Sequence, residues 1–526
     1  MLYLAVEIAA FFKNGILDFD MPRNFNGHIF LAIIAISICA ATVLSDEGRA
    51  MAESWPVLDG FRELELRGYV PLQPNVWPLR SGRMIAALPD SAVDSAARLW
   101  TGELRRCLES ARVPQDTISF IVEPGIGGVF NDPRDPDDLL YPTLRLGGGM
   151  RKGVVEGFVT YKVNLRWAFE DNYRGRQWSG FAGRPDQVYL RVDDDEWGVQ
   201  FGKDHISWGE GLVLGKSHAS FDRIDYEFEA GKFRFAGFTG WLDAIQYSRQ
   251  VGDERIYDLA FRYLSGHRLE FLSRHISVAM YEVILYGGVG RPFEAIYAVP
   301  FCWYHAEQLN RYLDDNTFIG GDFQVLFAPV RLSVEFMVDD LQVESQSQDD
   351  EEPPEIGFAA QADVGATIFD RWLTFTARYD AVTNWTYNQN NEWNRYLFME
   401  KPLGSELGND VDQIVAGAKF FASPKLSIGA KAFYKRKGEG RIDAPWSEPW
   451  LDIEGEYTEH FPTGVVERTT GVKINLGGNV WPFCFWDVDF EYGDVRNEGH
   501  EEGARSDYFR LGVSVNGSLY PSFNMN

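Results

Sequence analysis

The sequence contains few cysteines, and their spacing excludes two common kinds of scaffold. Only four occur among 526 residues: Cys39, Cys107, Cys302 and Cys484. Cys39 lies in an apolar leader-like stretch, so an odd three are left for the remainder of the chain. Their spacing fits neither a zinc site nor a disulfide framework. We therefore expect no structural metal and no cofactor.

Long apolar runs and basic charge are also scarce. No run of 18 apolar residues follows residue 50, which excludes a membrane protein built from helices. The chain has 50 Lys and Arg against 77 Asp and Glu, a formal charge of −27. Nucleic acid is not an expected partner, because phosphate binding requires a basic surface. An acidic surface suits divalent cations and neutral or cationic sugars, but it is equally a general aid to solubility.

Two stretches of the sequence resemble catalytic or nucleotide-binding motifs, but neither motif is complete. Residues 211–217 (GLVLGKS) are one residue short of a phosphate-binding loop and lie outside any βαβ unit. His205 and Glu210 are close in KDHISWGEG, but no second histidine four residues away and no nucleophile elbow accompanies them. We expect a glycine-rich turn with an aromatic anchor there and no catalytic residue. A hydrolase using Ser207 with His205 is the less favoured alternative.

The chain begins with a leader. An apolar run at 29–44 follows Arg23, and residues 50–52 (AMA) offer a cleavage site. This is the layout of a secretory signal peptide. We assign residues 1–52 to that peptide and expect the true start at Met21.

A short helical stretch follows the leader. Asp90 or Ser91 can cap a helix that runs to about Ala111, because apolar residues recur there at helical spacing. Residues 80–88 can form a second short helix. We assign residues 53–117 to a periplasmic helical segment, which is too small to form a core alone.

Residues 118–526 change to strand periodicity, and tight turns alternate with long polar loops. Outer-membrane barrels show this asymmetry, with short periplasmic turns and long outside loops. We predict an all-β fold, a transmembrane antiparallel β-barrel of about 18 strands in the outer membrane of a Gram-negative-type bacterium. Residues 287–315 must then be one long connection, directed outward or folded into the lumen. The tight turns are 328–329, 369–371, 423–424 and 481–482, and the long loops are 344–355, 385–410, 437–466 and 493–505. The predicted strands are 119–130, 141–149, 154–170, 186–193, 197–206, 223–229, 233–241, 256–271, 276–286, 316–327, 330–343, 356–368, 372–384, 411–421, 425–436, 467–480, 483–492 and 506–520.

The stretch 483–492 (FCFWDVDFEY) shows the expected side-chain pattern most clearly. Successive side chains of a strand point to opposite faces, so one face here is apolar and the other carries three carboxylates. The apolar set should face lipid and the carboxylates the lumen. The lipid-facing set is Cys484, Trp486, Val488 and Phe490, the lumen-facing set is Asp487, Asp489 and Glu491, and an aromatic girdle beside tight turns should include Trp372, Trp481 and Phe483.

The outside loops combine aromatic rings with acids and amides. Sugars are commonly bound by a flat ring under the pyranose face and by polar groups on the hydroxyls. The same rings could instead pack the loops together or form the upper girdle. The candidate glycan contacts are Trp385, Tyr387, Trp393, Trp446, Trp450 and Asp452.

With these patterns in place, the sequence resembles the Wzi family of capsule-assembly outer-membrane proteins. The resemblance rests on residues 66–69 (LRGY), 201–211 (FGKDHISWGEG), 266–271 (GHRLEF), 313–316 (LDDN) and 334–340 (VEFMVDD). Its motif residues are Gly202, Trp208, Gly209, Pro300, Asp315, Asn316, Asp322, Glu335, Asp339 and Asp340.

The resemblance implies an eighteen-stranded barrel with an occluded lumen and a lectin-like role. We therefore expect a non-catalytic protein that binds or anchors capsular or extracellular polysaccharide, with outer-membrane lipid or lipopolysaccharide around it. The main rival is a porin or solute channel, lined by inward charges. Those predicted inward residues are Lys162, Arg166, Arg378, Lys431 and Lys435 beside Asp380, Asp487 and Glu491.

Overall fold

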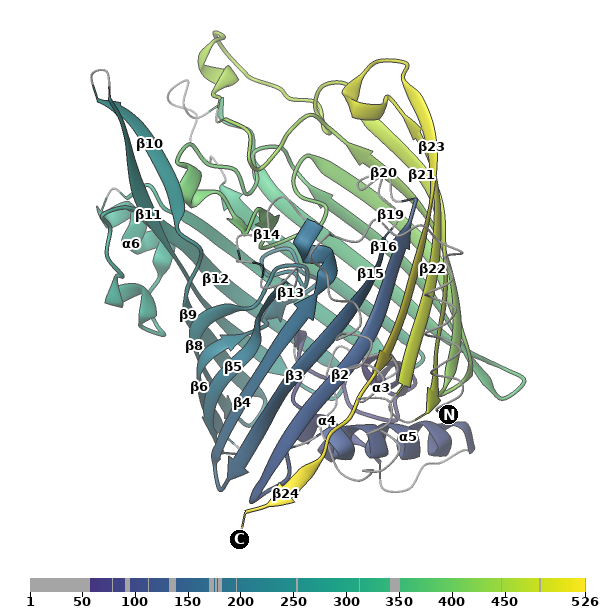
Figure 1. Cartoon of the computed structure of the whole chain (residues 1–526). Coiled ribbons are helices and arrows are strands. Elements are labelled where there is room, and N and C mark those ends of the chain that lie inside the picture. Colours follow the sequence, from purple (N-terminus) through teal and green to yellow (C-terminus); the bar gives the residue numbers. More distant parts are fainter. Residues whose placement is uncertain are drawn as a thin grey trace.

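The computed structural model describes most of the chain beyond the leader (Figure 1). The described residues are 57–526 without 78, 90–94, 112, 132–138, 170–174, 176, 178–181, 195, 252–253, 312, 341–350, 446, 482–483 and 526. The expected signal peptide, residues 1–52, lies outside them. Within the described part, no helix is both long enough and apolar enough to cross a membrane.

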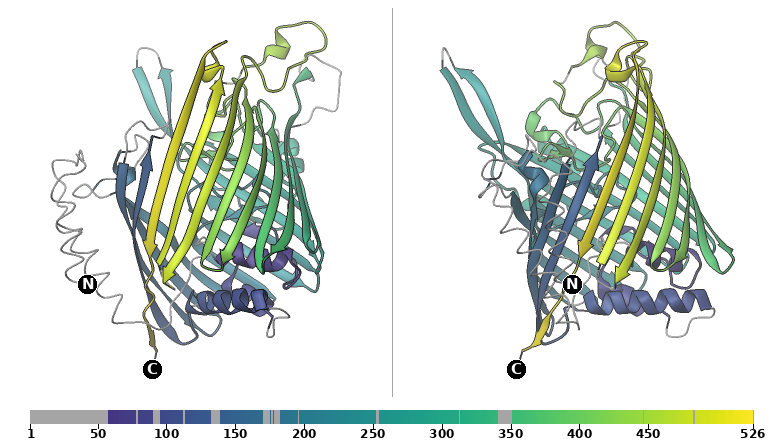
Figure 2. Two further views of the ribbon diagram at one scale, coloured as in Figure 1. Left: turned by 90° about the vertical axis from the view of Figure 1, so that its right-hand side faces the viewer. Right: turned by 45° about the vertical axis from the view of Figure 1, so that its right-hand side comes forward.

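Eighteen antiparallel strands form a closed barrel (Figures 1 and 2). Each strand pairs with the next along the chain, and β23 pairs with β2 to close the ring. The strands are β2 (Thr117–Phe130), β3 (Leu139–Lys152), β4 (Val155–Asn164), β5 (Gly183–Asp193), β6 (Trp197–Asp204), β8 (Phe221–Ala230), β9 (Phe233–Trp241), β11 (Glu254–Leu272), β12 (Ile276–Val289), β13 (Asn316–Phe327), β14 (Val330–Asp340), β15 (Glu355–Ile368), β16 (Arg371–Val382), β19 (Val411–Ser423), β20 (Leu426–Lys437), β21 (Glu467–Trp481), β22 (Cys484–Arg496) and β23 (Arg505–Gly517).

These are the eighteen predicted strands, with shifted ends. The largest error is at 165–170, predicted as strand, where a 3₁₀ helix, η1 (Leu165–Phe169), follows β4. The Arg166 N–H donates to the Asn164 side-chain oxygen (2.9 Å), which turns the backbone out of the ladder. Two further strands of the barrel sheet were not predicted: β10 (Ile245–Val251), which extends the outer end of β11, and β24 (Ser522–Asn524), which pairs with β2.

The predicted alternation of 483–492 is confirmed on β22. Phe490 and Tyr492 are exposed on the outer face. On the other face, Asp487 accepts a hydrogen bond from Asn475 (2.8 Å), and Arg510 lies 3.1 Å from Asp489. Apolar side chains therefore face outward, and paired polar side chains face the lumen.

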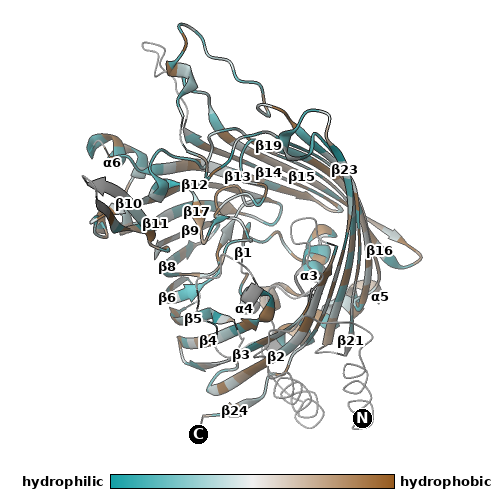
Figure 3. Ribbon diagram, turned by 45° about the horizontal axis from the view of Figure 1, so that its top comes forward, coloured by the Kyte–Doolittle hydropathy of each residue, from teal (hydrophilic) through white to brown (hydrophobic). Residues whose placement is uncertain are grey.

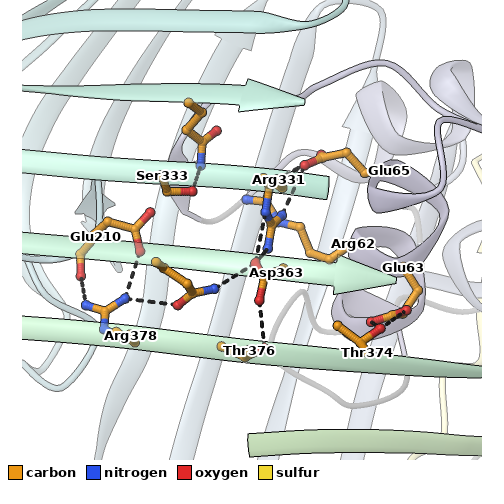
Figure 4. A network of polar contacts seen from close by, with 12 residues as sticks. Arg62, Glu63, Glu65, Glu210, Arg331, Ser333, Asp363, Thr374, Thr376 and Arg378 are labelled. Carbon is orange, nitrogen blue, oxygen red and sulfur yellow. Dashed lines mark hydrogen bonds and ion pairs between the residues drawn. The ribbon is translucent and has the colours of Figure 1, made fainter. Parts of the chain in front are cut away.

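Three helices occupy the end of the barrel where the short turns lie (Figure 2). They are α3 (Val57–Leu66), α4 (Ser81–Ala87) and α5 (Ser95–Ala111). Their apolar sides form one core with Trp372 and Phe421 of the barrel wall. Figure 4 shows acidic side chains of α3 beside Arg331 and Thr374, so charge as well as packing holds the helix to the wall.

One predicted girdle residue lies elsewhere. Trp372 points into the barrel and stacks on Trp100 of α5, with ring centroids 4.9 Å apart. The Arg67 guanidinium lies over the same indole at 4.6 Å. The girdle prediction for Trp372 was therefore wrong. Its ring packs against α5 and Arg67 inside the barrel, and these contacts stabilise it more than contact with lipid would. The Trp481 side chain and Phe483 lie outside the described part of the chain.

Candidate functional site in the lumen and its outer mouth

The connection between β6 and β8 folds back into the barrel, and we name residues 205–220 the lumen loop. Its strand β7 (Ser207–Trp208) pairs with β1 (Val76–Trp77) of the N-terminal segment. Leu212, Val213 and Leu214 are fully buried. Gly209 has a positive φ of 59°, and a Cβ there would collide with the Glu335 carboxylate. Only glycine permits this close approach of backbone to wall.

The Glu335 carboxylate on β14 anchors the lumen loop. It accepts backbone N–H bonds from Glu210 (2.6 Å) and Leu212 (3.1 Å), and a hydroxyl bond from Tyr281 (2.7 Å). A second anchor is Arg378 on β16, which donates to the Glu210 carboxylate at 2.7 Å (Figure 4). The predicted inward orientation of Arg378 is confirmed. These bonds hold the loop against β14 and β16.

The connection between β16 and β19 covers the lumen loop, and we name residues 383–410 the mouth loop. It contains η4 (Glu392–Asn394) and a short hairpin of β17 (Leu397–Phe398) and β18 (Lys401–Pro402). The Tyr387 hydroxyl donates to the Leu212 carbonyl, and the Tyr396 hydroxyl donates to the Val213 carbonyl (2.8 Å). Both tyrosines are fully buried in one core with the lumen loop and the inner wall. Two loops from different parts of the chain therefore form a packed bridge inside the barrel.

A single arginine fastens the mouth loop to β11. Arg262 donates to the backbone carbonyls of Trp393 (2.8 Å), Arg395 (2.7 Å) and Leu397 (2.7 Å). Its guanidinium also lies 3.2 Å from Asp243. Arg262 was not predicted from the sequence, although it shares one face of the predicted strand 256–271 with Arg268 and Glu270.

Several motif residues of the sequence resemblance hold these loops in place. Asp339 accepts the Tyr387 N–H (2.6 Å), and Asn316 donates to the Asn394 carbonyl (3.2 Å). Gly202 has a φ of 130°, and a Cβ there would lie 2.2 Å from the Val188 carbonyl. The remaining placements are Trp208 buried in the core, Asp322 paired with Arg268, Asp315 paired with Arg291, Pro300 before α6 (Tyr304–Arg311), and Asp340 at the end of β14.

The glycan candidates are spread over the mouth, and the structure brings only two of them together. Trp385 and Trp450 meet edge to face at 5.6 Å and are nearly buried. Tyr387 is fully enclosed, whereas Trp393 is half-buried against Tyr247. Asp452 is exposed, and Trp446 lies outside the described residues. Their contact with a glycan stays a prediction.

The next long loop is tied to the mouth loop through buried acids. Asp410 accepts the backbone N–H bonds of Gly440 (2.8 Å) and Thr463 (2.9 Å). Asn384 donates to Glu459 at 3.0 Å, and burial raises the pKa of that carboxyl. These hydrogen bonds join the two loops, so the outer mouth has one continuous surface.

A polar cavity of about 670 Å³ lies below the lumen loop, beside α4. Its wall pairs arginines with carboxylates, as where Arg191 donates to Glu227 at 2.6 Å. His205 borders it and lies 3.2 Å from Asp186, with its ring 5.5 Å from Trp77. Across the described chain, no cluster of three or more His, Cys, Asp or Glu could hold a metal ion.

The comparisons with known proteins support the fold. No protein family and no curated protein matches the sequence. Among solved structures, Wzi of Escherichia coli, described as a carbohydrate-binding outer-membrane β-barrel involved in group 1 capsule assembly, is similar with a TM-score of 0.61 and 13% identity. That alignment covers 88% of this chain and 98% of Wzi.

Two other barrels align less well. OccAB4 of Acinetobacter baumannii has a TM-score of 0.45 and 10% identity, over 78% of this chain and 99% of that one. OprD of Pseudomonas aeruginosa has a TM-score of 0.43 and 9% identity, over 77% and 95%. The closed eighteen-strand ring and its similarity to Wzi identify this chain as a barrel of the Gram-negative outer membrane.

Proposed function

We propose that this chain is a lectin-like member of the Wzi family that binds or anchors capsular or extracellular polysaccharide at the cell surface, without catalysis. The observation that supports this most is the packed bridge of lumen loop and mouth loop, which forms a buried core with the inner wall of the barrel. Such a bridge provides a rigid platform beneath the outer loops. The shared fold with a carbohydrate-binding barrel points the same way.

The polysaccharide would contact the outer surface of the mouth. Trp393 keeps part of its ring exposed, and Asp452 is exposed on the neighbouring loop. An aromatic ring and a carboxylate are the groups that suit a sugar, which has an apolar face and a polar rim. Tyr387 would act indirectly, by holding the mouth loop on the lumen loop.

The test compares cell-attached with shed polysaccharide in a deletion strain and its complement. We expect the attached fraction to fall on deletion and to return with the native gene. Complementation with Trp393→Ala plus Asp452→Ala should restore the barrel but not the attached fraction. Glu502→Ala, an exposed acid on another loop at the same end, is the matched control. An unchanged attached fraction in the deletion strain would contradict the proposal.

A solute channel is the second candidate, favoured by the polar cavity beside α4. Its paired arginines and carboxylates would suit a path for small polar solutes. Planar-bilayer recording separates the two functions: large steady currents from the purified barrel would support a channel, and small or no currents would support the packed bridge. A hydrolase has less support, because Ser207 is buried; it would require a hydrolytic activity that His205→Ala abolishes.

A further inference from the structure

Two ionisable side chains lie on the outer wall, at a position along the strand where β14 and β22 carry apolar residues. Counted from the turn between β11 and β12, the outward residues of β12 are Ile276, Val278, Met280 and then Glu282. The fourth outward residue is Phe336 on β14 and Phe490 on β22. His267 of β11 stands opposite Glu282 in the strand register. Hydrocarbon contact at this height would disfavour both groups.

The connection between β12 and β13 covers them, and we name residues 290–311 the wall arm. Glu282 accepts the backbone N–H bonds of Tyr304 (2.9 Å) and His305 (2.7 Å), at the start of α6. The His267 Nε2 lies 3.4 Å from the same carboxylate, and its ring is 4.7 Å from the Tyr304 ring. Glu282 thus has partners for its charge without water.

The inner side of the wall arm is as firmly packed as a protein core. Tyr297 and Tyr304 are fully buried, and the Tyr297 ring lies 4.7 Å from Tyr286 of β12. Arg291 at the base of the arm is paired with Glu294 (2.7 Å). Figures 1 and 3 both show α6 outside the ring of strands, next to β10 and β11. The arm is therefore a second layer on the outer wall.

The exposed side of the wall arm carries large apolar residues together with the polar His305, Asn310 and Arg311. Phe301 is 79% exposed, Trp303 76% and Leu309 61%. The Phe301 ring stacks at 5.4 Å on Phe235 of β9, which points outward from the wall. Below the arm, Met280 continues the same surface and is 69% exposed. The exposed side of the arm is thus continuous with the lipid-facing belt of the barrel.

We propose that the wall arm lies in the outer leaflet of the membrane, with Phe301, Trp303 and Leu309 in contact with lipid acyl chains. The height of Glu282 and His267 places the arm within the apolar band, and its exposed side carries the residue types that favour this position. A water-facing arm would leave two large aromatic rings exposed to solvent. The inference does not depend on the proposed function.

The arm also connects lipid to the outer mouth. Asn391 and Asn394 of the mouth loop donate to Asp314, immediately after the arm. Asp315 then pairs with Arg291 at its base. The mouth loop is therefore held both by the wall arm, on the membrane side, and by the lumen loop, inside the barrel.

Spin labels measure the depth of the arm directly. Each label is attached to one cysteine, at Phe301, Trp303 or Leu309, in a full-length chain whose native cysteines are replaced by alanine, and the barrel is reconstituted in phosphatidylcholine vesicles. Met280→Cys provides the lipid reference, and Glu454→Cys in an exposed loop provides the water reference. We expect the three arm labels to collide with oxygen more than with a water-soluble nickel chelate, as at Met280.

Two results would overturn the proposal. Collision with the nickel chelate equal to that at Glu454 would place the arm in water. Low collision with both reagents would indicate a protein partner, such as a second copy of the chain.

A doubly substituted arm is a second test. Phe301→Asp with Trp303→Asp should increase the collision of the Leu309 label with the nickel chelate. Phe261→Asp, an exposed aromatic beyond the arm on β11, should leave that label unchanged, and heat-modifiable gel mobility verifies that each variant folds.

Discussion

Two walls of the same barrel differ in how their charged side chains are buried. We call β20–β23 the plain wall and β9 with β11–β14 the covered wall. On the plain wall, charged side chains such as Lys473 and Asp489 lie 3.9 Å apart and stay partly exposed to the lumen. On the covered wall, Arg268, Glu270 and Asp322 are fully or almost fully buried beneath the lumen loop.

The difference shows that apolar and polar residues alternate along a strand only where its two faces contact different media, lipid and water. The plain wall separates lipid from water, so apolar and polar residues alternate. On the covered wall, loops lie against the inner face and the wall arm covers part of the outer face, so inward Tyr281 and outward Glu282 both have protein partners. Specific partners, and not the medium, decide which side chain each position tolerates.

The largest expected effect comes from breaking a buried ion pair on the covered wall. Arg268→Met leaves the carboxylates of Asp322 and Glu270 without their main partner, which should cost about 3–5 kcal/mol of unfolding free energy. Denaturant unfolding in lipid vesicles measures it. The matched change on the plain wall, Lys473→Met, should cost less than about 1 kcal/mol, because that pair is partly hydrated. Equal costs would contradict the distinction between the walls.

The next effect tests the outward face of the plain wall. Val488→Arg places a charge in the lipid belt and should cost about 2–4 kcal/mol in the same measurement. Val488→Ala controls for the lost packing and should cost less than the arginine variant. Tolerance of the arginine would mean that Val488 does not face lipid.

A smaller, local effect tests the mouth loop. Arg262→Ala removes three charge-assisted bonds to carbonyls, and loop opening should become easier by about 2 kcal/mol. Hydrogen exchange of residues 389–400 should accelerate while the barrel strands stay protected. Arg436→Ala, which removes the pair between Arg436 of β20 and Asp412 of β19, should leave that exchange unchanged.

The smallest effect is a pH dependence in the lumen loop. Burial lowers the pKa of His218 from 6.5 to about 4, so the folded loop favours the neutral imidazole. The unfolded state takes up the proton first, and stability is therefore complete above pH 6.5 and declines toward pH 4, by at most about 1.4 kcal/mol per pH unit. His218→Phe should flatten that part of the curve. A native curve identical to the variant's would refute the role of His218.

The plain wall was predictable from sequence, and the covered wall was predictable only as strands. Residues 484–492 follow the alternation, because lipid and lumen act on these positions in the same way. The connection at 287–315 was expected outward or in the lumen, whereas the wall arm lies on the outer face. Its position depends on Glu282 and Tyr286, contacts that local patterns do not reveal. Sequence likewise identified Glu335 and Asp339 through resemblance, but not that they hold two loops.

The joint between β2 and β23 has a consequence for the order of assembly. It brings together Gly125 and Asn516, roughly 390 positions apart, whereas the other joints connect strands that are neighbours in the chain. Neighbouring strands can pair as hairpins at small entropic cost, while a joint of such separation is costly in an open chain. Once the curved sheet has formed, its two edges already lie side by side and that cost largely disappears. The ring should therefore close last, after the hairpins have brought its first and last strands together.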